Sequence, residues 1–165
     1  SMKRIMSTEI WQKYPVYGFD SFEGLPEDWN DFNGNLVGRG KKGRFKTNVP
    51  YIPGVNWRIG WFSDTIKEYI QEEAEPIALL HVDCDLYNST KEILYGLNNY
   101  IVKNTIVVMD DWFYNHHPAF DDHSQKAFFE WVYDFHRKFE IVPFIDLVDG
   151  GDETKIIRIL DDPKV

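Results

Sequence analysis

The sequence of 165 residues contains one cysteine, no long apolar run and fewer basic than acidic residues. A single cysteine, Cys84, excludes an intramolecular disulfide and fits a reducing compartment such as the cytoplasm. No apolar stretch approaches the roughly 20 residues that a membrane-spanning helix needs, so we expect no membrane segment. The net charge of −9 argues against a protein that binds nucleic-acid phosphates through an excess of cations.

Apolar residues make up 43% of the chain, which is enough to form one hydrophobic core. We find no repeat, low-complexity tract or linker, and residues 1–165 are expected to form one domain. The pattern predicts helices at 2–14, 66–73, 91–100 and 124–138, and strands at 16–20, 55–61, 77–82, 105–109, 140–147 and 155–160. The last two strands flank a tight turn and should pair antiparallel, so we expect an α/β sheet with one reversed strand.

Two of these apolar strands each end in a pair of aspartates, Asp83 and Asp85 after the first and Asp110 and Asp111 after the second. The helix between them would be the crossover that makes the strands parallel. All four carboxylates would then meet at one edge of the sheet, where open α/β folds bind ligands. Their mutual repulsion favours a divalent cation at this edge.

Helix starts are expected where polar side chains can cap the chain, at Ser63–Thr65 and at Asn88–Thr90. Residues 30–54 are rich in glycine and proline and contain no periodic pattern. They carry a cluster of basic residues, Arg39, Lys41, Lys42, Arg44 and Lys46. This segment is either a solvated loop or a mobile lid over the site.

Four segments in order carry a resemblance to a known family: Gly18–Pro26 (GFDSFEGLP), Gly60–Thr65 (GWFSDT), His81–Thr90 (HVDCDLYNST) and Asp110–Trp112 (DDW). The chain resembles the macrocin O-methyltransferase (TylF-like) family over roughly residues 15–160. These are class I enzymes that use S-adenosylmethionine (SAM) to methylate sugar hydroxyls of antibiotics. The resemblance implies a three-layer Rossmann-like fold, with a mostly parallel sheet and an antiparallel C-terminal hairpin.

The resemblance also implies roles for individual residues. The residues that it implies in cofactor binding are Asp20, Ser21, Ser63, Asp64 and His81. Asp20 would bind the ribose, and Ser63 and Asp64 would lie beside the adenine. The magnesium ligands are Asp83, Asp110 and Asp111. Mg²⁺ binds hard oxygen ligands and would lower the pKa of the acceptor hydroxyl. Asp83, His116 or His117 would take the proton of that hydroxyl.

Simpler interpretations of the same residues stay open at this point. Asp20 could cap the turn that follows it. His81 could be a hydrogen-bonded core histidine, and Cys84 a small buried apolar group. His116 and His117 could be surface-loop histidines without a catalytic role.

The sequence departs from the family at its start. Class I methyltransferases begin with a strand and a glycine-rich turn that approaches the cofactor, whereas none of the first 15 residues here is glycine. The family's first strand therefore lacks a counterpart, and residues 1–14 correspond to a remnant of its first helix. In the family sheet that strand separates the strands at 16–20 and 77–82. We expect these two strands to pair directly, or a partner chain or second copy to complete the sheet.

The sequence is compatible with three functions. The first is a SAM-dependent, Mg²⁺-assisted O-methyltransferase acting on a sugar or polyol hydroxyl. The second is a methyltransferase-like module that has lost SAM binding in whole or in part and serves binding or assembly. The third is a glycosyltransferase, because an apolar strand followed by Asp83-Cys84-Asp85 resembles its metal motif and the basic residues at 39–46 could meet a diphosphate.

Overall fold

The structure is a computed structural model that describes residues 14–30, 34–36, 40–72, 74–112, 123–143 and 154–164. Its strands are β1 (Val16–Asp20), β2 (Val55–Ile59), β3 (Leu79–Val82), β4 (Ile106–Met109), β5 (Phe139–Ile141) and β6 (Lys155–Ile159). Its helices are α2 (Phe62–Glu72), α3 (Tyr87–Gly96), α4 (His123–Asp134) and the short 3₁₀ helix η2 (Asn98–Tyr100). The predicted helix 2–14 lies almost wholly outside the described residues, and His116, His117 and the turn 149–152 lie outside them entirely.

The predicted strands agree with the structure better than the predicted helix starts. Strand β1 has the predicted bounds, and β2, β3, β4 and β6 are each shorter by one or two residues. The strand predicted from residue 140 is the three-residue β5. Periodic apolar residues therefore located the strands, because each strand has one face in the core.

Both predicted helix caps were wrong. Helix α2 already begins at Phe62, which puts Ser63 inside its first turn. Helix α3 begins at Tyr87 without a side-chain cap. The Thr90 side chain is instead fully buried, with its hydroxyl 3.2 Å from that of Ser124 on α4. The Thr90 hydroxyl therefore takes part in a tertiary contact, whereas local sequence chemistry predicted that it would cap the helix.

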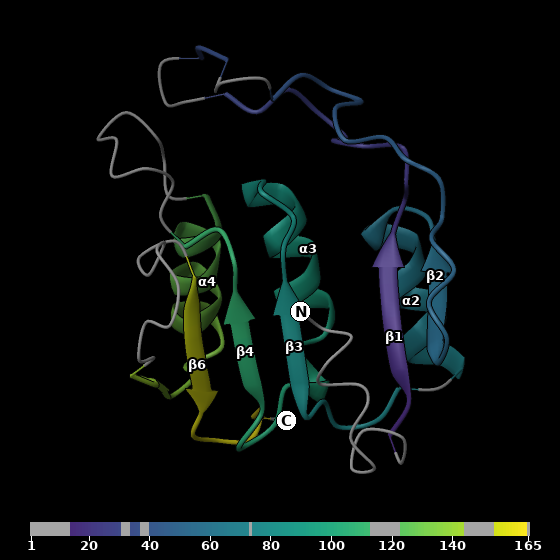
Figure 1. Cartoon of the computed structure of the whole chain (residues 1–165). Coiled ribbons are helices and arrows are strands. Elements are labelled where there is room, and N and C mark those ends of the chain that lie inside the picture. The colour runs from purple at the N-terminus through teal and green to yellow at the C-terminus, as the bar shows by residue number, and fades with distance from the viewer. Residues whose placement is uncertain are drawn as a thin grey trace.

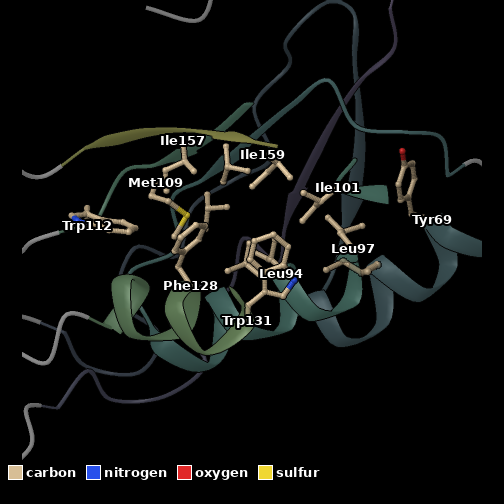
Figure 2. Packing of buried hydrophobic residues seen from close by; sticks show 14 residues of the cluster. Tyr69, Leu94, Leu97, Ile101, Met109, Trp112, Phe128, Trp131, Ile157 and Ile159 are labelled. Atoms are coloured by element: carbon tan, nitrogen blue, oxygen red, sulfur yellow. The ribbon is translucent and has the colours of Figure 1, made fainter. Parts of the chain in front are cut away.

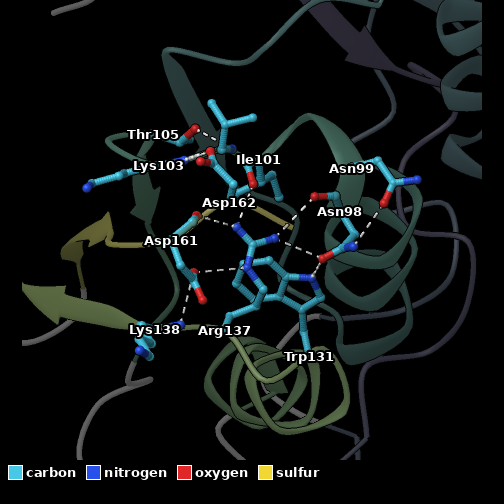
Figure 3. A network of polar contacts seen from close by, with 11 residues as sticks. Asn98, Asn99, Ile101, Lys103, Thr105, Trp131, Arg137, Lys138, Asp161 and Asp162 are labelled. Carbon is cyan, nitrogen blue, oxygen red and sulfur yellow. Dashed lines mark hydrogen bonds and ion pairs between the residues drawn. The ribbon is translucent and has the colours of Figure 1, made fainter. Parts of the chain in front are cut away.

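Helix α4 ends at Asp134, four residues earlier than predicted. His136 follows in the left-handed region with φ 52°, which turns the chain away from the helix axis. This turn places Arg137 between α4 and the end of β6. The guanidinium donates to the backbone oxygens of Asn98 and Ile101 and to the Asp161 carboxylate, and it stacks on Trp131 (Figure 3).

The strands form two separate sheets (Figure 1). One contains the parallel pair β1 and β2, and the other has the order β3-β4-β6-β5. In the second sheet β3 and β4 are parallel, whereas β6 runs antiparallel to both β4 and β5. The predicted antiparallel pair at the C-terminus is confirmed.

The predicted direct pairing of the 16–20 strand with the 77–82 strand was wrong. Within the described residues, β1 and β3 are edge strands of different sheets. Strand β1 pairs with β2 instead and is joined to the rest of the fold through α2. Helix α2 packs against α3 so closely that a Cβ at Gly96 would lie 3.0 Å from Ile66 Cγ2.

The main core lies between the four-stranded sheet and the three helices, which all cover one face of the strands (Figures 1 and 2). Val107 and Met109 of β4 and Ile157 of β6 pack against Phe128 and Trp131 of α4, and all five are fully buried. A second helical layer, as the three-layer expectation requires, is not among the described residues. No described helix is long and apolar enough to cross a membrane.

Candidate active site

A cavity of about 1090 Å³ opens where β1 and β3 end. Its walls come from the ends of both sheets, from the start of α2, from one face of α3 and from the segments 19–27 and 42–45. Its lining includes Asp20, Ser21, Gly24, Lys42, Phe45, Trp61, Ser63, Asp83, Cys84 and Asp85. Ligand pockets commonly measure about 300–1,000 Å³, so this one has room for two small molecules at once.

The aspartates that follow β3 and β4 meet as the sequence predicted. Strands β3 and β4 are parallel and paired, with Val82 opposite Met109, so the residues after them emerge side by side. The backbone N–H of Asp85 donates to Asp111 Oδ2 at 3.1 Å. Asp85 itself has a positive φ of 60°, which an aspartate tolerates better than most residues.

Burial and neighbouring carboxylates raise the pKa values of several side chains at this edge of the sheet. Burial raises the pKa of Asp111 to about 7 and that of Asp85 to about 6, and neighbouring carboxylates add to both effects. The pKa of Asp83 is raised by loss of water first and by Asp110 second. Burial also raises the pKa of the Cys84 thiol to about 12. The thiol therefore stays protonated and unreactive, in agreement with the packing role expected for it.

The structure brings two of the three predicted magnesium ligands together. Ligand atoms of Asp83, Asp110 and His81 all lie within 4.8 Å of one another. Asp111 is absent from this group of described residues, because its carboxylate is directed to the Asp85 backbone. Two carboxylates suit Mg²⁺, and an imidazole suits a softer ion such as Zn²⁺. Asp110 also accepts a hydrogen bond from the Thr154 hydroxyl at 2.9 Å, which orients one of its oxygens.

His81 is not a core histidine. It belongs to β3, where Leu80 and Val82 face the helices while Leu79 and His81 are exposed. The alternation of a strand therefore places the imidazole on the face opposite the helices, beside the carboxylates. Among the candidate residues this is the clearest case in which the predicted burial was wrong.

The residues predicted to bind the cofactor lie at the other end of the cavity. Asp20 ends β1, and its Oδ1 accepts the Phe22 N–H at 2.7 Å, so the capping role is present. Its second oxygen is not used by that bond. Ser21 and Ser63 line the cavity, whereas Asp64 is exposed in the first turn of α2 and does not. Trp61, which is 41% exposed, lines the wall next to Ser63.

Sequence reasoning missed two parts of this cavity. It placed Asp85 in the acidic cluster but chose Asp83 over it as a metal ligand, although both aspartates of the Asp83-Cys84-Asp85 motif line the wall. It also left open whether the basic segment touches the site, and Lys42 and Phe45 do so. The positive charges at 41–46 were the only sequence feature that singled out this segment. No local pattern shows which part of the molecule a loop of this length contacts.

The comparisons with known proteins agree with the resemblance that the motifs suggested. Residues 51–129 match the family model of the macrocin O-methyltransferases (TylF). The solved O-methyltransferase NovP superposes with a TM-score of 0.63 at 21% identity, covering 97% of this chain and 65% of that one. The calicheamicin methyltransferase CalS11 superposes with a TM-score of 0.67 at 19% identity, covering 95% and 65%.

A further structure of CalS11, described as a TDP-rhamnose 3′-O-methyltransferase, gives a TM-score of 0.56 at 17% identity over 95% of this chain. This chain spans 65% of the length of each of these structures. No curated protein matches the sequence significantly. At such identities the structural likeness establishes the fold, which is that of the class I methyltransferases.

Proposed function

Because the chain has the class I methyltransferase fold and matches the macrocin O-methyltransferase model over residues 51–129, we propose that it contributes to SAM-dependent O-methylation of a sugar or polyol hydroxyl. The observation that carries the proposal is the cavity itself. One wall has the ribose-binding type of carboxylate at Asp20, and another has the acidic cluster at Asp83 and Asp85. A cofactor and an acceptor can therefore lie side by side in it.

Asp20, Ser21 and Ser63 are the residues proposed to bind SAM. The free oxygen of Asp20 can accept hydrogen bonds from ribose hydroxyls while its partner oxygen holds the turn. The exposed ring of Trp61 offers an apolar surface for an adenine next to the α2 N-terminus. SAM, when bound, supplies a methyl group on a positively charged sulfur. Asp64 and His81 lie outside the lining of the cavity, and we propose no direct contact for them.

Asp83 and Asp110 are proposed to hold Mg²⁺, with Asp111 as a further carboxylate beside them. Their oxygens fit the hard-ligand preference of this ion, and Thr154 fixes one of them. Mg²⁺, when bound, lowers the pKa of an acceptor hydroxyl and offsets the repulsion among the aspartates.

The proton of the acceptor hydroxyl is proposed to pass to a carboxylate oxygen of Asp83 or Asp85. Both side chains line the cavity, so both can reach a hydroxyl bound there. His116 and His117 stay candidates from the sequence, since they lie outside the described residues.

A second candidate function follows from the divided sheet. The edges of β1 and β3 that face each other have no strand partner among the described residues, and no glycine-rich turn is found there. A strand from a partner chain or from a second copy would satisfy both edges and complete the cofactor pocket. Without it, the chain would act as a methyltransferase-like binding or assembly module.

Calorimetric titration with S-adenosylhomocysteine, with and without Mg²⁺, tests the proposal. We expect micromolar binding and an affinity about tenfold lower in Asp20→Asn, because the amide keeps the cap on Phe22 but loses the charged acceptor. Glu75→Gln is the control, since Glu75 is exposed and far from the cavity lining. Absence of binding by the chain alone, restored when a partner strand is added, would support the second candidate instead.

A further inference from the structure

The segment of residues 22–30, here called the strap, runs from the tip of β1 over the end of β3 (Figure 1). Leu25 and Trp29 of the strap form a small core with Leu86, which lies between β3 and α3. All three side chains are buried. Asn88 of α3 also donates from its side-chain nitrogen to Glu27 Oε1 at 2.7 Å. The strap is therefore attached to the start of α3 both by apolar packing and by a hydrogen bond.

Asp85 lies at the centre of a tight turn just before α3. The Leu86 N–H donates to the Cys84 backbone oxygen at 2.6 Å, and the φ of Asp85 between them is 60°. A three-residue turn with a positive φ at its centre is rare and strained. Such a conformation persists only where the surrounding contacts impose it. The bond from the Asp85 N–H to Asp111 restrains one side of the turn, and the packing of Leu86 under the strap restrains the other.

Helix α3 begins directly after this turn, with Leu86 at its N-cap position. A leucine has no side-chain oxygen that could accept a hydrogen bond from the free N–H groups of the first turn. His123, the first residue of α4, takes this role, because its Nδ1 accepts the Tyr87 N–H at 3.1 Å. The centre of the same imidazole lies 6.3 Å from that of the Trp29 ring. One histidine therefore connects the strap, α3 and α4 two residues away from Asp85.

These contacts lie behind the wall of the cavity. Asp85 lines the cavity, whereas Trp29, Leu86 and His123 do not. Only one methylene group separates the backbone of an aspartate from its carboxylate, so the backbone conformation decides where the carboxylate can point. A proton acceptor must lie within hydrogen-bond reach of the group that it deprotonates, and small displacements reduce the rate strongly. Contacts that fix the turn at Asp85 therefore bear on the chemistry without touching a ligand.

We propose that His123 and Trp29 are positioning residues for Asp85. His123 caps α3 through the Tyr87 N–H, Trp29 holds Leu86 in place, and together they fix the turn that keeps the Asp85 carboxylate at the cavity wall. The restraint of the turn stands on these contacts alone. The role of Asp85 as the proton acceptor rests on the proposed function.

NMR on the full chain without ligands tests the inference, because scalar couplings across the N–Cα bond of Asp85 report its φ. We expect the wild type to show a positive φ at Asp85 and the ¹⁵N shift of an unprotonated Nδ1 in neutral His123. His123→Ala and Trp29→Ala should each lose the positive φ. Both should also exchange the Leu86 amide about tenfold faster, as for one lost hydrogen bond.

Two further variants separate positioning from a general loss of structure. His123→Asn retains an acceptor close to the position of Nδ1 and should keep the positive φ at Asp85. Tyr95→Phe is the matched control, because it removes another α3–α4 contact, the bond from the Tyr95 hydroxyl to Asp134 at 2.5 Å, at the far end of α3. It should leave Asp85 unchanged.

The inference is overturned if Asp85 keeps its positive φ in both alanine variants, if Tyr95→Phe loses it as well, or if His123→Asn behaves like His123→Ala. S-adenosylhomocysteine should bind His123→Ala as tightly as wild type, since Asp20, Ser21 and Ser63 lie on the other side of the cavity. Failure of the wild type to bind it would overturn the role of Asp85 as proton acceptor, whereas the NMR result would still decide whether His123 and Trp29 fix the turn.

Discussion

The strand residues of the two sheets differ greatly in how far they are buried. In the four-stranded sheet Val107, Met109, Ile157 and Ile159 are fully buried against α3 and α4. In the two-stranded sheet no residue of β1 or β2 is fully buried. The difference shows where the stability of the fold resides, because buried apolar area is its main source.

The small sheet is attached to the large one through a helix and not through strand hydrogen bonds. Tyr17 and Phe19 of β1 place their rings 4.9 Å and 5.5 Å from the ring of Tyr69 on α2, which in turn packs against α3. The cavity lies across this junction, so ligand binding joins two parts of unequal stability. Regions of low local stability are the ones that open first and that a ligand orders most.

The largest expected effect is on the large sheet. Trp131→Ala should lower the free energy of unfolding by about 3–5 kcal/mol, because the fully buried indole packs on Phe128 and donates to Asn98 Oδ1 at 3.0 Å. Urea denaturation followed by circular dichroism measures it. Tyr133→Ala, on the same helix but 78% exposed, is the control and should change stability little. Equal losses in the two variants would contradict the assignment of the core.

The next effect should separate the two sheets. Tyr69→Ala removes the ring that joins β1 to the helices and should cost about 2–4 kcal/mol. We expect amide hydrogen exchange to lose protection in β1 and β2 while β4 stays protected. Tyr69→Phe keeps the ring contacts and should retain most protection of β1. Uniform loss across both sheets would instead show that they unfold as one unit.

A smaller effect is expected at the wall of the cavity. Gly24→Ala combines a φ of 81° with the collision at the Arg44 oxygen, so it should lower the free energy of unfolding by about 1–3 kcal/mol and release the loop of residues 40–47. Exchange of the Gly43 amide, which donates to Leu25, reports on the release. Gly54→Ala has a similar φ of 83° but meets nothing within 4 Å. If the two substitutions cost the same, the close approach at Gly24 is not what holds the loop.

The smallest effect belongs to the surface between α3 and α4. Lys91 pairs with Glu130 at 2.8 Å, but each side chain is 36% exposed. Lys91→Gln should therefore change the free energy of unfolding by no more than about 1 kcal/mol, with less effect at high salt. Thermal melting at low and high ionic strength measures this. A larger loss that salt does not reduce would show that the pair acts by packing and not by charge.

Periodicity and motif order predicted much of this fold and part of its site. The strands ending at Asp20, Val82 and Met109 were located from their apolar runs, and the meeting of the aspartates followed from the parallel pairing of β3 and β4. The cap predicted at Asn88–Thr90 failed because Thr90 is used in a contact with Ser124 of α4, which lies more than 30 residues away in the chain. The predicted burial of His81 was wrong, because periodicity within a strand does not show which of its two faces the described helices cover.

The sequence by itself determined where strands and carboxylates occur, since both follow from the identity of neighbouring residues. Only the tertiary structure decided that β1 pairs with β2 and not with β3, because strand pairing depends on segments that are distant in the sequence. It also decided that Lys42 and Phe45 line the same cavity as Asp83 and Asp85. Gly24 permits the close approach of two loop backbones beside that cavity, because a Cβ there would lie 2.2 Å from the Arg44 oxygen.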